Sequence, residues 1–307
     1  MASSKAPAAA RVLCAGIAVQ DIVLRVPTFP TPGGKSLADA FFIVSGGCAV
    51  NAAIAVARLG GDARYVGPLG DTNDAVSNQL LAEMKHEGID TSGVVRVAGA
   101  RAPVSGIMID GGGERMIATY HDDRIENASL ANPERVVENI SVLLADNRFP
   151  NFVRPICEAA RRRGIAVVLD ADRPTEMHDP LFAIATHVVF SSECLRATAG
   201  SNDLAAGLKQ MAPRTKAFLA VSNGPNDVLY LRDGAVKTVP VFALDVVDTL
   251  AAGDVFHAGF ALALAEGRDE VAAIRFGAAA AGLKCTRIGG SAGAPKRAEV
   301  DALLARG

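Results

Sequence analysis

Residues 141–193 read SVLLADNRFPNFVRPICEAARRRGIAVVLDADRPTEMHDPLFAIATHVVFSSE, and this stretch decides the fold class. Three short apolar runs in it, at 141–145, 166–169 and 187–190, have the length and composition of buried strands. A segment of helical period, 152–163, lies between the first two. Strands that alternate with helices are typical of a parallel sheet covered by helices, so the stretch predicts an α/β protein.

Polar side chains follow each of these strands at its carboxyl end. Residues 146–148 (DNR), 170–172 (DAD) and 191–193 (SSE) come directly after apolar residues. Ligands bind at this edge of open α/β sheets. The sequence therefore predicts a carboxylate-rich site there.

The alternation extends to both sides of this stretch. The apolar run from Val12 to Val19 predicts a buried first strand. Residues 73–86 predict a helix, with capping oxygens at 71–73 and Gly88 at its end. Residues 1–10 are small, polar and rich in Ala and Pro, and we expect them to be disordered.

Two segments break the alternation. Residues 22–45 and 102–120 lack helical period and have the character of hairpins, the second turning through residues 110–114. They predict a small β sheet that projects from the α/β body as a lid over the site. No repeat, linker or charge run divides the chain, so we expect a single domain over residues 1–307.

The composition narrows the range of partners. A formal net charge of −2 provides no broad cationic field for nucleic acid or an anionic membrane. The five cysteines are scattered singly, without a CxxC pair, and we interpret them as reduced thiols of a cytoplasmic protein. The histidines show no ligand spacing either, so no zinc site is predicted.

A carboxylate at a predicted helix start is the main candidate for chemistry. Residues 245–257 read DVVDTLAAGDVFH, in which small residues precede an amphipathic segment. Backbone N–H groups of Ala251, Ala252 and Gly253 could approach an anion such as phosphate, favoured by the helix dipole. Asp254 would then accept a proton from an attacking hydroxyl during phosphoryl transfer. It could equally do no more than complement the helix N-terminus, and these residues alone leave both interpretations open.

Three short elements together resemble a known family. Residues 45–53 (SGGCAVNAA) contain a Gly-Gly-x-x-x-Asn element, residues 67–71 (GPLGD) a Gly-x-x-Gly-Asp element, and residues 248–254 (DTLAAGD) an Asp-Thr-x-Ala-Ala-Gly-Asp element. In order and approximate spacing they resemble the PfkB or ribokinase family of carbohydrate kinases, and the likeness runs from Val12 to the C-terminus. It implies a ribokinase-like sandwich, with a mostly parallel central sheet flanked by helices and a small β lid.

The resemblance also implies roles for single residues. Asp254 matches the catalytic base, and the backbone of Ala251 to Gly253 matches the anion hole. The positions that match those holding sugar hydroxyls are Asp21, Gly46, Gly47 and Asn51. The positions that resemble the nucleotide-binding loop are Ser222, Asn223, Gly224 and Asn226. Asp227 departs from the pattern, because the family often has a second Gly there.

The cofactors that the resemblance implies are ATP and Mg²⁺. Many relatives carry Asn-x-x-Glu near the magnesium, and here Glu193 is displaced from that pattern by one position. It would act through water, or the nucleotide phosphates would hold Mg²⁺. Asp248 resembles a monovalent-cation ligand, which implies K⁺.

The nearest likeness within the family is to the sulfofructose kinase branch. There, cationic residues at the positions of Lys35 and Arg148 face a sulfonate, whereas Thr119 stands where that branch has Asn. A solvated lid charge and a structural ion pair are the alternative interpretations of Lys35 and Arg148. The substrate hypothesis is therefore a ketose or furanose sugar, with or without an acidic group such as the sulfonate of 6-deoxy-6-sulfofructose, phosphorylated at a primary hydroxyl.

Several other functions remain open at this level. Within the family they are ribokinase, fructokinase, ketodeoxygluconate kinase and nucleoside kinase. A sugar-binding regulator without catalytic activity is a further alternative. A dinucleotide-dependent oxidoreductase lacks its fingerprint, because no G-x-G-x-x-G follows the first strand. We also expect a homodimer formed through the lid sheets, since an exposed β layer offers edges to a second copy.

Overall fold

The computed structural model describes residues 10–306 and is built around a sheet of eight strands. Its strand order is β14-β13-β12-β11-β10-β9-β1-β4, parallel from β12 to β4, with β13 and β14 antiparallel at one edge. The strands are β1 (Arg11–Ala15), β4 (Asp62–Val66), β9 (Val142–Asp146), β10 (Ala166–Ala171), β11 (His187–Ser191), β12 (Phe218–Asn223), β13 (Asn226–Arg232) and β14 (Ala235–Val239). The predicted α/β class with a mostly parallel sheet is confirmed.

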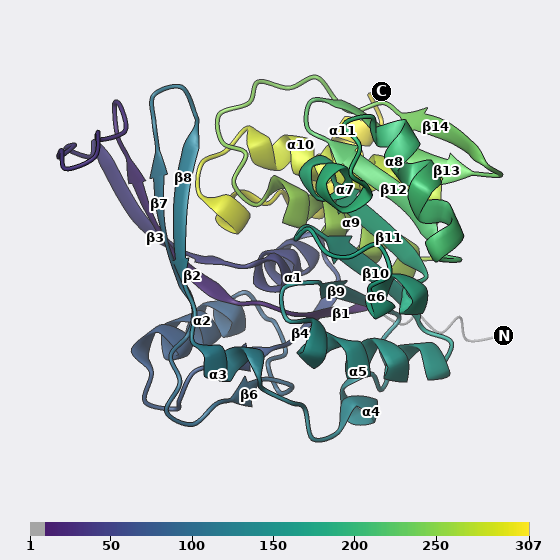
Figure 1. The fold of residues 1–307 in the computed structure, drawn as a ribbon, viewed down its shortest axis with the longest axis horizontal. Coiled ribbons are helices and arrows are strands. Elements are labelled where there is room, and N and C mark those ends of the chain that lie inside the picture. The colour runs from purple at the N-terminus through teal and green to yellow at the C-terminus, as the bar shows by residue number, and fades with distance from the viewer. Residues whose placement is uncertain (1–9, 307) are drawn as a thin grey trace, which may run out of the picture.

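Helices cover both faces of this sheet (Figure 1). Along β1, Val12 and Cys14 point into one apolar layer, and Leu13 and Ala15 into the other. The first layer contains α1 (Cys48–Arg58), α2 (Ala75–His86), α9 (Ala252–Ala265), α10 (Glu270–Cys285) and α11 (Arg297–Leu304). The second contains α5 (Pro150–Arg162), α6 (Pro180–Ile184), α7 (Ser192–Ala199) and α8 (Leu204–Met211), with the short α3 (Asp123–Glu126) and α4 (Pro133–Val136) beside them. Strands buried on both faces explain the continuous apolar runs of the sequence.

A separate sheet of four strands stands out from this body at the left of Figure 1. Its order is β3 (Ala40–Gly46), β2 (Val19–Arg25), β7 (Val104–Ile109) and β8 (Arg115–Tyr120), and we call it the small sheet. One face packs Val23 and Ile107 against Leu250 of the body. A minor pair, β5 (Pro68–Leu69) and β6 (Val95–Arg96), and the 3-10 turns Ala212–Arg214 and Gly290–Gly293 complete the elements.

Two predicted elements needed correction. The predicted strand from Val12 to Val19 is two strands in different sheets, because the chain leaves the main sheet at Gly16, where φ is +148°. The predicted helix start, residue 73, also lies two residues before the observed one. The helix begins at Ala75, since Asp74 is the cap and its carboxylate accepts the N–H of Ser77.

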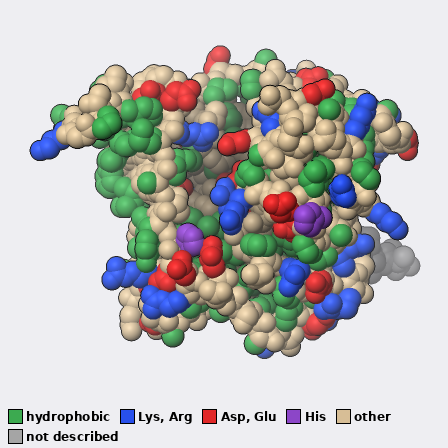
Figure 2. Space-filling view, in the orientation of Figure 1, with side chains coloured by type: hydrophobic (Ala, Val, Ile, Leu, Met, Phe, Trp, Pro, Cys, Tyr) green, Lys and Arg blue, Asp and Glu red, His purple; other side chains and the backbone are tan. Residues whose placement is uncertain are grey.

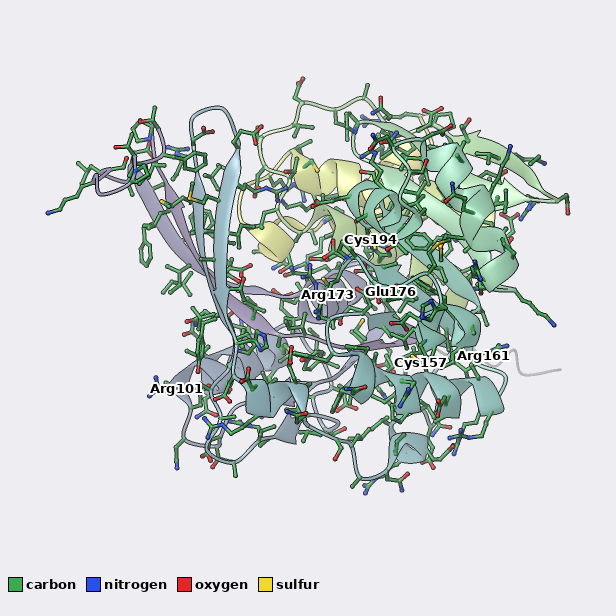
Figure 3. The ribbon with its side chains drawn as sticks, viewed as in Figure 1. Arg101, Cys157, Arg161, Arg173, Glu176 and Cys194 are labelled. Carbon is green, nitrogen blue, oxygen red and sulfur yellow. The ribbon has the colours of Figure 1, made fainter. Side chains whose placement is uncertain are left out.

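The other predicted elements agree with the structure to within two residues at most ends. The strands β9, β10 and β11 and the helix α5 lie where residues 141–193 placed them. All five cysteines are buried free thiols, and Figure 3 shows Cys157 and Cys194 on separate helices. No helix among residues 10–306 is long and apolar enough to span a membrane. The prediction of a disordered N-terminus concerns residues 1–9, which lie outside the described residues, and Ala10.

Candidate active site

The N-terminus of α9 forms one side of the candidate site. Ala251 is the cap of this helix and has a left-handed backbone, with φ 63° and ψ 12°. The N–H of Ala252 donates to the carbonyl of Thr249 at 3.2 Å. The N–H groups of the first turn that follow it, at Gly253 and Asp254, lie where a helix has no acceptors of its own. They are the donors that an anion can use, and Asp254 lies beside them.

Asp254 is joined to the start of α1. The Asn51 Nδ2 donates to Asp254 Oδ2 at 2.7 Å, across 203 residues of sequence. Asn51 is buried, and its Oδ1 has no hydrogen-bond partner among the described residues. An unpaired buried acceptor is costly unless a ligand donates to it. Asn51 Oδ1 is therefore a place for a substrate hydroxyl.

A second carboxylate, Asp170 at the end of β10, faces Asp254. Cys48 Sγ, an Asp170 oxygen and an Asp254 oxygen all lie within 4.8 Å of one another. Asp170 Oδ1 also lacks a hydrogen-bond partner among the described side and main chains. Burial raises the pKa of Asp170 well above its usual range, and the charges of Asp172 and Asp254 raise it further. The pKa of Asp254 is raised as well, first by burial, while the Asn51 hydrogen bond opposes the shift.

His257 stands behind this pair of carboxylates. It is buried, and its Nε2 lies 3.4 Å from Asp170 Oδ1. Its two ring nitrogens also contact backbone carbonyl oxygens, Nδ1 that of Gly253 at 2.7 Å and Nε2 that of Val189 at 3.1 Å. The histidine thus connects the first turn of α9 to the middle of β11 and to the end of β10.

The small sheet contributes Asp21 on the opposite side. Asp21 lies between Val44 and Ser105 on the neighbouring strands, and Ser105 Oγ is 3.0 Å from Thr119 Oγ1. A Cβ on Gly46 would overlap the Asp21 carboxylate, so only glycine leaves that carboxylate in its place. Burial raises the pKa of Asp21 to about 6, with Ser105 opposing and Asp254 adding to the shift.

Gly47 has a backbone that favours glycine for a different reason. Its φ is +89°, in the region that L side chains rarely adopt, and it is the residue before α1. The pair Gly46 and Gly47 therefore does more than form an ordinary turn: one leaves room for Asp21, and the other sets the start of the helix that carries Asn51.

The two predicted cationic residues of the site, Arg148 and Lys35, differ in their surroundings: Arg148 is in an ion pair and Lys35 is exposed to solvent. The Arg148 guanidinium is paired with Asp172, and the backbone N–H of Arg148 donates to Asp146 Oδ1 at 3.0 Å. Asp146 is buried and also accepts the Ile17 N–H, and burial raises its pKa to about 6. Lys35, by contrast, is exposed in the connection between β2 and β3.

Figure 3 shows Arg173 and Glu176 on the loop after β10, near the middle of the molecule. The backbone N–H of Arg173 donates to Asn147 Oδ1 at 3.0 Å.

A cavity of about 600 Å³ lies next to the start of α9. Ala252 and Gly253 form part of its wall, together with the predicted nucleotide-loop residues Ser222, Asn223 and Gly224. Most of its other lining residues are apolar, and they include Val228, Phe242, Ala278 and Ala281. Asn226 is not among them, because its side chain turns back to donate to the carbonyl of Asn223. The cavity suits a flat apolar ring whose attached anion reaches the first turn of α9.

The two predicted metal ligands have different surroundings. Glu193 is an exposed carboxylate in the first turn of α7. Asp248 instead has a protein cation as its partner, because Lys284 Nζ lies 3.0 Å from its Oδ2. Burial would raise the pKa of Asp248, but the N–H of Leu250 and the Lys284 ammonium bring it below its usual range.

The structure places most of the predicted site residues in one region, and it brings residues there that the sequence did not predict. Figure 2 shows a hollow between the small sheet and the body, with charged side chains at its rim. Sequence reasoning missed Ser105, the burial of His257 beside Asp170, and Lys284. Ser105 and Lys284 follow no motif. His257 carried one signal, since it lies one helical turn after Gly253 and on the same side of α9.

Comparisons with known proteins bear on the family and the fold of this chain. The model of the "pfkB family carbohydrate kinase" matches residues 9–297. Ribokinase from Bacillus subtilis is 28% identical over 291 residues, which cover 94% of this chain and 97% of that protein. A crystal structure from Agrobacterium tumefaciens, provisionally named a ribokinase, is 35% identical with a TM-score of 0.92 and covers 97% of this chain and 98% of its own. A fructokinase with bound ATP from Xylella fastidiosa is 25% identical with a TM-score of 0.76, covering 96% and 98%.

Proposed function

Because this chain belongs to the pfkB family of carbohydrate kinases, we propose that it transfers the γ-phosphoryl group of ATP to a primary hydroxyl of a ketose or furanose sugar. It is a sugar kinase, and the proposal concerns its phosphoryl donor, its acceptor and its residues. The observation that carries the assignment is the position of Asp254. It belongs to the first turn of α9, and its carboxylate accepts from the Nδ2 of Asn51, the residue whose Oδ1 is left without a partner.

ATP is proposed as the donor on two grounds. The 600 Å³ cavity is mostly apolar and opens onto Ala252 and Gly253, as an adenine with its phosphates requires. A related fructokinase was solved with bound ATP. Mg²⁺ would neutralise charge on the phosphates, and the exposed Glu193 offers the oxygen ligand that this ion prefers, directly or through water.

The residues of the chain have distinct tasks in this mechanism. Asn51 and Asp170 accept hydrogen bonds from sugar hydroxyls, and Asp254 takes the proton of the attacking one. The N–H groups at the start of α9 stabilise the negative charge of the group in transfer. The small sheet acts as a lid: it brings Asp21 to the sugar and excludes water when it closes.

The charge of the site favours a sugar rich in hydroxyls. Asp21, Asp146, Asp170, Asp172 and Asp254 surround it; their oxygens accept hydrogen bonds from hydroxyls, and those that are ionised repel a second anion. A neutral ketose or furanose is therefore the first candidate. A ketose with an acidic group, such as 6-deoxy-6-sulfofructose, is the second, because the Arg148 guanidinium lies at the same strand ends and could exchange Asp172 for a sulfonate.

A substrate panel distinguishes these candidates. The full chain, ATP and Mg²⁺ would be tested with neutral, phosphorylated and sulfonated ketoses, ribose, ketodeoxygluconate and adenosine, with ADP release as the readout. We expect the highest kcat/KM for a ketose or furanose and no sugar-dependent release in EDTA. If an acidic group is recognised, Arg148→Ala and Lys35→Ala should each lower kcat/KM for that sugar about 10- to 100-fold and leave neutral sugars nearly unchanged.

Other outcomes of the panel would overturn parts of the proposal. A clear preference for adenosine would make the chain a nucleoside kinase. No sugar-dependent ADP release with any compound, together with sugar binding measured by calorimetry, would favour a non-catalytic regulator.

We also propose a homodimer through the small sheet. Every residue of its edge strand β8 is exposed, and Phe41 of β3 is 60% exposed. An open edge strand with apolar side chains is a surface that proteins usually cover. Sedimentation at micromolar concentration should give the mass of two chains for the wild type and of one chain for Phe41→Glu. A wild type that sediments as a single chain contradicts the proposal.

A further inference from the structure

A buried lysine supports the loop in front of the anion site. Lys284, near the end of α10, is fully buried, which lysine almost never is unless it is paired. Its Nζ donates to the backbone carbonyl of Asp248 at 2.8 Å and lies 3.0 Å from Asp248 Oδ2. Both partners are oxygens of the residue that begins the Asp248-to-Asp254 segment.

Asp248 in turn joins two loops at this point. Its Oδ1 accepts the N–H of Leu250 at 2.8 Å, and its Oδ2 accepts the N–H of Gly289 at 3.0 Å. The N–H groups of Val247 and Asp248 both donate to the carbonyl of Cys285. The ammonium therefore lies where the segment that leads to α9 meets the turn that follows α10.

Close packing of the two helices brings the lysine to this place. A Cβ on Gly277 of α10 would lie 2.6 Å from the Phe256 carbonyl of α9, so the helix backbones nearly touch. Ala251, three residues after Asp248, holds the strained φ of 63°. A fixed Asp248 keeps this turn in the conformation that presents the N–H groups of Gly253 and Asp254.

A K⁺ ion bound to Asp248 does not fit this arrangement. The carbonyl and carboxylate oxygens that would hold a monovalent cation are already bound to Lys284 Nζ. An added ion would lie against a like charge in a buried position, where repulsion is poorly screened. An ammonium has the same charge as K⁺, and oxygens are its natural partners as well.

We infer that the Lys284 ammonium takes the place of a monovalent cation, so that this chain holds its anion site without K⁺ or Na⁺. Lys284 is a positioning residue, since it acts on the N–H donors of α9 through Asp248. The inference depends on the proposed function only for its kinetic readout. The stability readout requires neither a sugar nor ATP.

The test compares cations at constant ionic strength. The wild type should show the same Tm and the same kcat/KM in KCl, NaCl and tetramethylammonium chloride. Lys284→Ala, which leaves room for an ion, should lose about 10- to 100-fold in kcat/KM without K⁺, because the anion donors shift. Added KCl should restore most of that loss and raise its Tm by about 2–4 °C.

Two further variants make the result specific. Lys284→Met fills the space without a charge, so it should show the same loss but no response to K⁺. Lys209→Ala removes an exposed lysine from the last turn of α8 and should behave as the wild type. If Lys284→Ala is poorly folded, its refolding yield with and without KCl replaces the Tm comparison.

Either of the following results would contradict the inference on Lys284. A wild type whose Tm or kcat/KM rises with K⁺ would show that the chain still uses a cation. A Lys284→Ala protein with full activity, or with equal Tm or refolding yield in all three salts, would show that Lys284 replaces no ion. If no sugar is phosphorylated, the Tm series still decides the matter.

Discussion

Asp254→Asn should slow phosphoryl transfer about 10²–10⁴-fold, the range that a positioned general base contributes. The introduced amide has nearly the same shape and can still accept the Asn51 N–H, so the geometry of the site should survive. It cannot take the proton of a hydroxyl. We therefore expect ATP to bind with nearly unchanged affinity in calorimetry while kcat collapses.

The same variant should also be at least as stable as the wild type. Burial and the charge of Asp172 raise the pKa of Asp254, which means that the folded protein disfavours its carboxylate. A neutral amide removes that repulsion, and Tm should stay equal or rise. Loss of activity with retained stability is the pattern of a catalytic residue rather than of a structural one.

A matched control separates the base from a helix-terminal charge. Asp269 caps α10 and accepts the N–H of Ala272 at 2.8 Å, at an exposed position. Asp269→Asn should cost little, since Asn caps helices about as well as Asp. If Asp254→Asn is as active as Asp269→Asn, Asp254 is only a complement to the helix dipole, and the mechanism is wrong.

Gly46→Ala should lower kcat/KM for the sugar about 10- to 100-fold, mainly through KM. The added Cβ would overlap the Asp21 carboxylate, which has to move away from the sugar side of the site. The cavity next to Ala252 and Gly253 is built from other elements. The KM for ATP should therefore remain close to that of the wild type, as steady-state kinetics with each substrate varied would reveal.

Gly106→Ala is the corresponding control within the small sheet. A Cβ there has the Ala118 carbonyl as its nearest atom, at 4.0 Å, which is an ordinary contact. Its kinetics should match the wild type. Equal sugar KM values for Gly46→Ala and the wild type would show that Asp21 does not contact the substrate.

The sequence predicted the fold and the edge of the sheet at which side chains gather. Alternating apolar runs and helical segments were sufficient for the parallel body, and polar residues after each strand marked Asp146, Asp170 and Asp172. Periodicity could not show that Asp254 and Asn51 meet, because they lie 203 residues apart. Only the resemblance to a family placed both in one site.

What the sequence did not predict depends on packing between distant segments. A lysine near the end of an Ala-rich helix is usually solvated, and nothing in residues 278–290 indicates that Lys284 is buried against Asp248. The break at Gly16 was missed because the apolar run continues through it while the chain changes sheets. Ser105 becomes visible only when the register of β2, β7 and β8 is known.

The most direct measurement is ³¹P NMR of the full chain incubated with ATP, Mg²⁺ and each ketose or furanose of the panel, beside Asp254→Asn. The mechanism predicts a new phosphomonoester signal, coupled to a –CH₂– group of the sugar and equal in amount to the ADP formed, with the wild type alone. ADP that appears with inorganic phosphate and no sugar ester, or an ester formed equally fast by Asp254→Asn, would contradict it.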